Sequence, residues 1–218
     1  MGISIGGGIT IGTGISCSGV LPGTPMGGGY YAGQISTTGD GVATHYLIVA
    51  DKTLGQTTGL VWGPTATVTG VTSVIDGPGN SAALGALGIG YEAANFCLTL
   101  DINGYTDWYL PSKNELEVCY YYFKIQGGNN YFYRSNANAV APEPISTNYT
   151  QILPPPTTAE AFIYGSGAQA FDFAWYFTST EVNNNIAGSQ SWYNGSQGGS
   201  NKTDSTNTRV RAIRRVPI

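Results

Sequence analysis

The stretch GYTDWYLPSKNELEVCYYYFK, residues 104–124, constrains the fold of this chain more than any other segment. Ser112 follows Pro111 and precedes Glu115 by three positions, which is the pattern of a capping box at a helix start. Beyond it, apolar residues recur at spacings of three and four. The pattern therefore predicts a helix over 113–124 with one buried stripe.

The residues before this helix predict a fixed corner. Asn103 and Gly104 are suited to a turn of the chain, and Trp108 and Leu110 are large apolar side chains that can pack in a hydrophobic core. A broad apolar face further upstream predicts another helix near residues 90–100. The corner would then fix the orientation of these two helices relative to each other.

Alternating apolar and small residues predict a sheet in the rest of the chain. Residues 44–63 are typical of a β-hairpin, because β-branched and aromatic residues flank a polar connection. Strands are also expected within residues 171–181, 189–195 and 209–216. Residues 64–88, with a DGPGN turn, predict a surface loop. The fold class predicted from these elements is α+β.

Glycine and isoleucine set the first 40 residues apart. Isoleucine recurs mostly at even spacing, as in a ribbon with one apolar side, at Ile3, Ile5, Ile9, Ile11 and Ile15. So few large side chains cannot offset the ~1–2 kcal/mol per residue that ordering a backbone costs. We therefore divide the chain into an arm for attachment or oligomerisation, residues 1–40, and a main domain, residues 41–218. The arm is expected to dock on another subunit of a homo-oligomer, a trimer in our interpretation, or on another protein; a disordered tail is the alternative.

Composition excludes several classes of partner. Charged residues make up 10% of the 218 residues and the net charge is −4, so the chain has no basic field for nucleic acid. No apolar run approaches the ~20 residues that span a bilayer, so membrane insertion is not expected. The first residues lack a positive segment followed by a continuous apolar one, so secretory export is not expected either.

Several motifs occur in an order that carries a family resemblance. They are NGYTDWYLPSKNEL (103–116), WYFTSTE (175–181), SQSWYNG (189–195), Lys202 and RVRAIRRV (209–216). In this order they resemble the Lcl C-terminal (DUF1566-like) domain family, over roughly residues 42–216. The resemblance implies a C-type-lectin-like fold, with two helices packed on distorted antiparallel sheets, here preceded by the Gly-rich β arm. More narrowly, the chain resembles virion structural proteins of tailed phages, particularly cyanophages.

The signature residues of this resemblance are interpreted as structural, because buried aromatic and capping residues more often pack a core than contact a ligand. They are Trp108, Leu110, Pro111, Ser112, Glu115, Trp175 and Arg211. Arg209, Arg211, Arg214 and Arg215 form the one basic cluster in the sequence. Alternation along a strand favours paired structural charges over an anion site, with Glu181 as a candidate partner.

Catalytic and metal-binding patterns are weak. His45 is the single histidine, so histidine pairs for catalysis or metal binding cannot form. The calcium tripeptides of classical C-type lectins have two near-matches, Glu143-Pro144-Ile145 and Trp192-Tyr193-Asn194-Gly195, and both lack a required ligand oxygen. Cys97 and Cys119 fall on apolar helix faces, as inert cysteines do. We expect no enzymatic activity, no metal and no cofactor.

Residues 181–207 are the candidate recognition segment. Asn, Ser, Gln and Gly surround two adjacent aromatic residues, a composition that adaptable binding loops use. The predicted ligand-binding residues are Asn183, Asn185, Gln190, Trp192, Tyr193, Asn194 and Asn201. A solvated loop without a ligand is the alternative.

Two functions are compatible with this sequence. The first is a phage virion protein, in a tail fibre, a baseplate or a head decoration, whose arm binds other virion proteins and whose lectin-like domain recognises a host-surface receptor or glycan. The second is a bacterial surface or secreted adhesin that binds glycans with the same domain. The lack of a recognisable secretion signal favours the first, and with it location in the virion.

Overall fold

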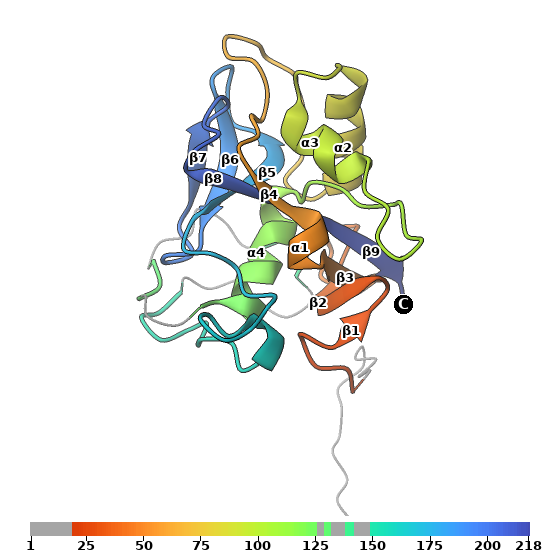
Figure 1. The fold of residues 1–218 in the computed structure, drawn as a ribbon, viewed down its shortest axis with the longest axis vertical. Coiled ribbons are helices and arrows are strands. Elements are labelled where there is room, and N and C mark those ends of the chain that lie inside the picture. Colours follow the sequence, from red (N-terminus) through yellow and green to blue (C-terminus); the bar gives the residue numbers. More distant parts are fainter. Residues whose placement is uncertain (1–18, 126–128, 132–137, 142–148) are drawn as a thin grey trace, which may run out of the picture.

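The computed structural model describes residues 19–125, 129–131, 138–141 and 149–218 (Figure 1). Residues 1–18 of the predicted arm lie outside the described residues, and so does the Glu143-Pro144-Ile145 tripeptide. Helices and two curled sheets mix along the chain, which confirms the α+β class. In the described part, no helix combines the length and apolarity needed to cross a bilayer.

The first sheet has four antiparallel strands in the order β1-β2-β3-β9. Their bounds are β1 Pro25–Met26, β2 Gly29–Ile35, β3 His45–Ala50 and β9 Ile213–Pro217. Strands β1 and β2 belong to the region predicted as an arm, and they pair within this sheet. Gly23 and Thr24 also hydrogen-bond to the backbone of Tyr31. A segment free to reach another subunit can therefore include only the residues before Gly23.

The second sheet has five strands in the order β4-β8-β5-β6-β7. Their bounds are β4 Gln56–Thr58, β5 Trp175–Glu181, β6 Ile186–Ser191, β7 Gln197–Asn201 and β8 Thr208–Arg211. Strands β5 and β8 run parallel, so this sheet is mixed, whereas purely antiparallel sheets were expected. Strand β7 has two central glycines and no apolar alternation, which is why the sequence did not predict it.

Four α-helices and one 3-10 turn complete the described part. Their bounds are α1 Lys52–Gly55, α2 Gly77–Ala86, α3 Glu92–Leu98, α4 Lys113–Phe123 and η1 Glu160–Phe162. The predictions of α3 and α4 are confirmed. The prediction of a loop over residues 64–88 is wrong for α2, because the Asp76 side chain caps the first turn and Pro78 is tolerated there.

The predicted hairpin over residues 44–63 is also wrong. Strand β3 is present, but the one-turn helix α1, capped by Asp51, redirects the chain into the other sheet. The expected strand over 209–216 divides in the same way at Ala212, with β8 in the second sheet and β9 in the first. The strand expected over 189–195 ends at Ser191 and continues as a turn.

Helix α4 lies between the two sheets, with its buried side chains in one apolar cluster together with residues of both (Figure 1). A second cluster joins α2 and α3 to the other faces of the sheets. Strand β3 contributes side chains to both clusters. Leu47 and Val49 belong to the first cluster, and Ile48 and Ala50 belong to the second. The sheets are therefore covered by helices where they meet, and their outer strands reach the surface.

Candidate functional site

The structure divides the predicted recognition residues between two ends of the second sheet. Asn183 and Asn185 lie in the turn between β5 and β6, and Asn201 pairs with Ile186 at that same end. Tyr193 lies at the opposite end, beyond the last residue of β6. The six residues of β6 separate the two groups by roughly 17–20 Å, at about 3.3 Å per residue. One small ligand cannot contact both groups.

Trp192 and Gln190 are each 1% exposed, so the structure removes them from the recognition surface. The Trp192 indole stacks on Phe171 with ring centroids 4.1 Å apart, and its Nε1 donates to the carbonyl of Phe123. The Gln190 amide donates to the carbonyl of Gly195, while its oxygen is buried without a partner in the described part of the chain. Trp192 is a core residue because the chain turns inward directly after β6.

An open pocket of about 350 Å³ lies at the Tyr193 end of the sheet. The first residues of β5 and β8 and the last residue of β6 meet here, because Trp175 pairs with both Ser191 and Thr208. The pocket is lined by Phe173, Ala174, Trp175, Tyr193, Thr206, Asn207 and Arg209. Its volume is in the range that holds a small ligand.

Three aromatic side chains line this pocket, which we call the aromatic pocket. Tyr193 is 51% exposed, and its ring centroid lies 5.5 Å from that of Phe173. Tyr164 packs edge-on against the other side of Phe173, with centroids 4.6 Å apart. Trp175 is half-buried and lines the pocket, although it was interpreted as purely structural. The rings therefore contact one another, while Tyr193 stays half exposed.

Polar residues also line the pocket. Asp204 accepts hydrogen bonds from the backbone N–H groups of Thr206 and Asn207, which fixes the loop that carries these two residues. Burial alone would raise the pKa of Asp204, but these bonds outweigh it and the pKa is lowered, so the carboxylate stays ionised. The loop therefore presents its exposed amide and hydroxyl in a defined position.

Arg209, which also lines the pocket, is held in place by an ion pair. Its Nε donates to Asp172 at 2.9 Å, and Lys52 donates to the same carboxylate at 2.7 Å. Burial opposes ionisation of Asp172, yet the two cations lower its pKa. One carboxylate against two cations leaves a local charge of +1. Phe173 and Arg209 were not predicted as site residues, because nothing in the sequence indicates that these segments meet. Asn207 lies within the predicted recognition segment, residues 181–207, but was not among the named ligand-binding residues.

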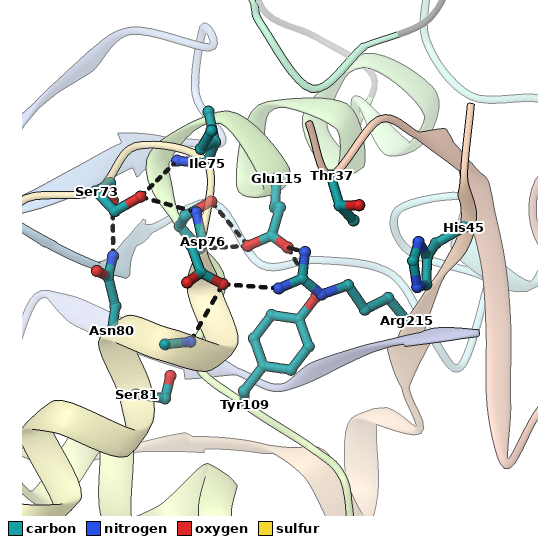
Figure 2. Close-up of polar contacts among 12 residues, drawn as sticks. Thr37, His45, Ser73, Ile75, Asp76, Asn80, Ser81, Tyr109, Glu115 and Arg215 are labelled. Atoms are coloured by element: carbon teal, nitrogen blue, oxygen red, sulfur yellow. Dashed lines mark hydrogen bonds and ion pairs between the residues drawn. The ribbon is translucent and has the colours of Figure 1, made fainter. Parts of the chain in front are cut away.

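The corner predicted from the sequence forms a second polar cluster, which Figure 2 shows in close-up. Trp108, Leu110 and Ser112 are buried, and Ser112 with Glu115 makes the expected capping box. Glu115 accepts from the Ser112 backbone at 2.9 Å and from the Tyr109 hydroxyl at 2.8 Å. The Arg215 guanidinium lies between the carboxylates of Glu115 and Asp76, at 4.0 and 2.8 Å.

Burial dominates the electrostatics of this corner. Glu115 is fully buried, which raises the pKa of its carboxyl group although Arg215 and the hydrogen bonds act in the opposite direction. Burial likewise raises the pKa of Tyr109 well above its usual value. The carboxylate, the hydroxyl and the guanidinium satisfy one another and line none of the pockets described here. We interpret the corner as structural.

Three of the four arginines in the cluster pair with carboxylates, as expected, whereas Arg211 donates to neutral groups in the described part of the chain. Arg214 makes two hydrogen bonds to Asp107, and Arg211 donates to the Ala50 carbonyl and to Gln56. Burial lowers the pKa of Arg211 to about 10, so it remains charged at neutral pH. Glu181, expected as an arginine partner, instead forms a buried ion pair with Lys202 and accepts from the backbone of Thr69 and Gly70. The turn before β5 brings Asp172, rather than Glu181, to Arg209.

Metal and thiol chemistry have little support in the described residues. These residues contain no group of three or more His, Cys, Asp or Glu side chains that could hold a metal ion. Cys97 and Cys119 are unpaired and buried, and burial raises the pKa of both thiols above the range in which a thiolate forms at neutral pH.

Comparison with known proteins gives no relatives for this chain: no family model, no curated protein and no solved structure matches it.

Proposed function

We propose that this chain is a non-enzymatic virion structural protein of a tailed phage, in a tail fibre, a baseplate or a head decoration. Its domain, for which we propose a C-type-lectin-like fold, binds a host-surface carbohydrate in the aromatic pocket. The observation that carries this proposal is the pocket itself, of about 350 Å³, which aromatic and polar residues line together.

The chemistry of the pocket suits a sugar. A pyranose ring has an apolar face of C–H groups, which packs on an aromatic ring, and a rim of hydroxyls, which needs donors and acceptors. Tyr193 and Trp175 offer rings, while Asn207 and Thr206 offer polar groups on the loop that Asp204 fixes. Small-ligand sites commonly combine apolar walls with a few placed polar groups.

The distribution of titratable groups supports a binding role over catalysis. A general acid or base must reach the reacting atom of a substrate. Glu115, a carboxyl group with a raised pKa, is enclosed by its own partners in the corner. At the pocket, Asp172 is bound by Lys52 and Arg209.

A glycan array with purified protein tests the binding function. Wild type should bind a subset of glycans, and Tyr193→Ala should weaken binding to the best of them about tenfold, or ~1.4 kcal/mol, because it removes stacking area. Tyr105→Ala, at another exposed tyrosine, is the matched control and should bind like wild type. Equal binding by both variants would exclude this pocket as the sugar site.

The virion assignment rests on the family resemblance and needs its own test. Mass spectrometry of purified particles from a phage that encodes this chain should find it as a stoichiometric component. Its presence on a bacterial surface, with none in particles, would support the adhesin instead.

A further inference from the structure

Strand β7 leaves one side of the second sheet open. In the β6–β7 ladder, Lys202 N donates to Asn185 O and Ser191 N donates to Ser196 O, both at 2.9 Å. Because bonding alternates along an antiparallel pair, Gly198 and Ser200 bond to β6. The backbone groups of Gln197, Gly199 and Asn201 then point away from the sheet. Within the described residues, the outward N–H and C=O of Gln197 and Gly199 have no partner.

The other outer strands of the two sheets are protected against pairing. Strand β1 has two residues and begins with Pro25, and β4 has three residues. Strand β9 carries Arg214, Arg215 and Pro217. Short length, charge and proline all discourage the addition of a strand. Strand β7, with the sequence QGGSN, has five residues, no charge and no proline.

Space around β7 also permits a neighbour. Gly198 and Gly199 are exposed, so no side chain at these positions blocks the approach of another backbone. Trp175 lies beside Gly198 and Ile186 lies beside Gly199, and both side chains are half-buried. An added strand would therefore gain main-chain hydrogen bonds and cover part of an apolar side chain.

The chain itself contains a segment of matching chemistry. Ile3, Ile5, Ile9 and Ile11 all occupy odd positions, so an extended strand over residues 3–11 has its isoleucines on one face and only small residues, glycine, serine and threonine, on the other. We propose that residues 3–11 of a second copy of this chain pair with the outer edge of β7. This inference does not depend on sugar binding at the aromatic pocket.

Geometry favours a second copy over the same chain. Figure 1 shows β7 and β1 on opposite sides of the molecule, and the chain enters the first sheet at β1. The 18 residues before Gly19 span at most about 60 Å at 3.3 Å per residue, and an arm of the same chain would spend much of this length crossing the domain. Exchange from one copy to the next is head-to-tail and can close a ring, such as the trimer expected from the sequence.

Three proteins test the docking by light scattering. Wild type should be oligomeric, whereas a chain that begins at Gly19 and the full chain with Gly198→Lys should both be monomeric. A lysine at 198 adds charge to the edge, and a side chain there meets only the Trp175 ring, at an ordinary 3.7 Å. Gly90→Lys, at another exposed and open glycine, is the matched control and should stay oligomeric.

A peptide of residues 1–16 gives an independent readout. Labelled peptide should bind the chain that begins at Gly19, and Gly198→Lys in that chain should weaken binding at least about tenfold. Hydrogen exchange of the Gly199 amide should slow when the peptide binds, because this N–H points toward the added strand. An oligomer that survives removal of residues 1–18 would indicate pairing between two β7 strands instead, and would overturn the proposal. Peptide binding unaffected by Gly198→Lys would overturn it as well.

The light-scattering and peptide-binding tests can be interpreted independently of sugar recognition. The chain that begins at Gly19 retains every residue of the aromatic pocket, so its binding to the best glycan reports on the pocket alone. Loss of oligomers with retained sugar binding is the expected result. Oligomers without any glycan binding would contradict the proposed function and leave the arm inference supported.

Discussion

The corner around Glu115 and the pocket around Tyr193 both gather aromatic and polar side chains, but they differ in how many of their interactions remain available. In the corner, the carboxylate, the tyrosine hydroxyl and the helix cap bond to one another, and Glu115 is completely buried. In the pocket, Tyr193 is about half exposed. Similar residue types therefore serve stability in one region and are open to recognition in the other.

Removal of the Glu115 carboxylate should reveal the largest difference in stability between the two regions. Glu115→Ala leaves the Ser112 N–H, the Tyr109 hydroxyl and part of Arg215 without a partner in a buried site. We expect the free energy of unfolding to fall by about 3–5 kcal/mol, as when one partner of a buried charged group is deleted. Urea titration followed by circular dichroism measures it.

The matched truncation in the pocket is Tyr193→Ala. Its free energy of unfolding should stay within about 0.5 kcal/mol of wild type, because the side chain is largely at the surface. Comparable losses in Glu115→Ala and Tyr193→Ala would mean that the pocket is part of the structural core, and the distinction between the regions would fail.

A smaller effect is expected at the helix cap. Ser112→Ala removes the side-chain half of the capping box of α4 and should lower the free energy of unfolding by about 1 kcal/mol. Ser166→Ala, at an exposed serine in a turn, provides the control and should change little. An unchanged melting temperature for Ser112→Ala would argue that α4 is fixed by packing alone.

Local signals account for the parts of the fold that the sequence predicted. The cap at Ser112 and the periodicity after it define α4, since both depend on neighbours within one or two turns. Which sheet each strand joins was harder to predict, because it depends on pairing with residues far along the chain. Nothing near Ala212 indicates that the residues on its two sides enter different sheets.

The candidate site shows the same limit. Tyr193 was predicted from the composition of its own loop, and it does line the pocket. Phe173 and Arg209 lie outside the predicted recognition segment, and they join Tyr193 in the pocket only because β5 and β8 pair in parallel at their first residues. Trp192, next to Tyr193, has the same local composition and is buried, because in the turn after β6 its ring packs on Phe171 in the core.

The smallest expected difference is electrostatic, and the two regions should respond to pH in opposite directions. Burial raises the pKa of Glu115 above the 4.5 of an unfolded chain, so the folded state binds its proton more tightly. Its protonation therefore stabilises the fold as pH falls from neutral toward about 4.5. Lys52 and Arg209 lower the pKa of Asp172 below 3.8, despite burial, so its contribution is present above that value and is lost as pH falls further.

Urea titrations at a series of pH values, for wild type, Glu115→Gln and Asp172→Asn, isolate the two groups. The stability of wild type relative to Glu115→Gln should increase as pH falls from about 7 to about 4.5, because only wild type gains the favourable proton. The stability of wild type relative to Asp172→Asn should stay level over that range and decrease below about pH 4, where the ion pairs with Lys52 and Arg209 are lost. If both differences changed with the same sign, the carboxylate of the corner would be solvated like that of the pocket, and the buried corner would not be the structural element described here.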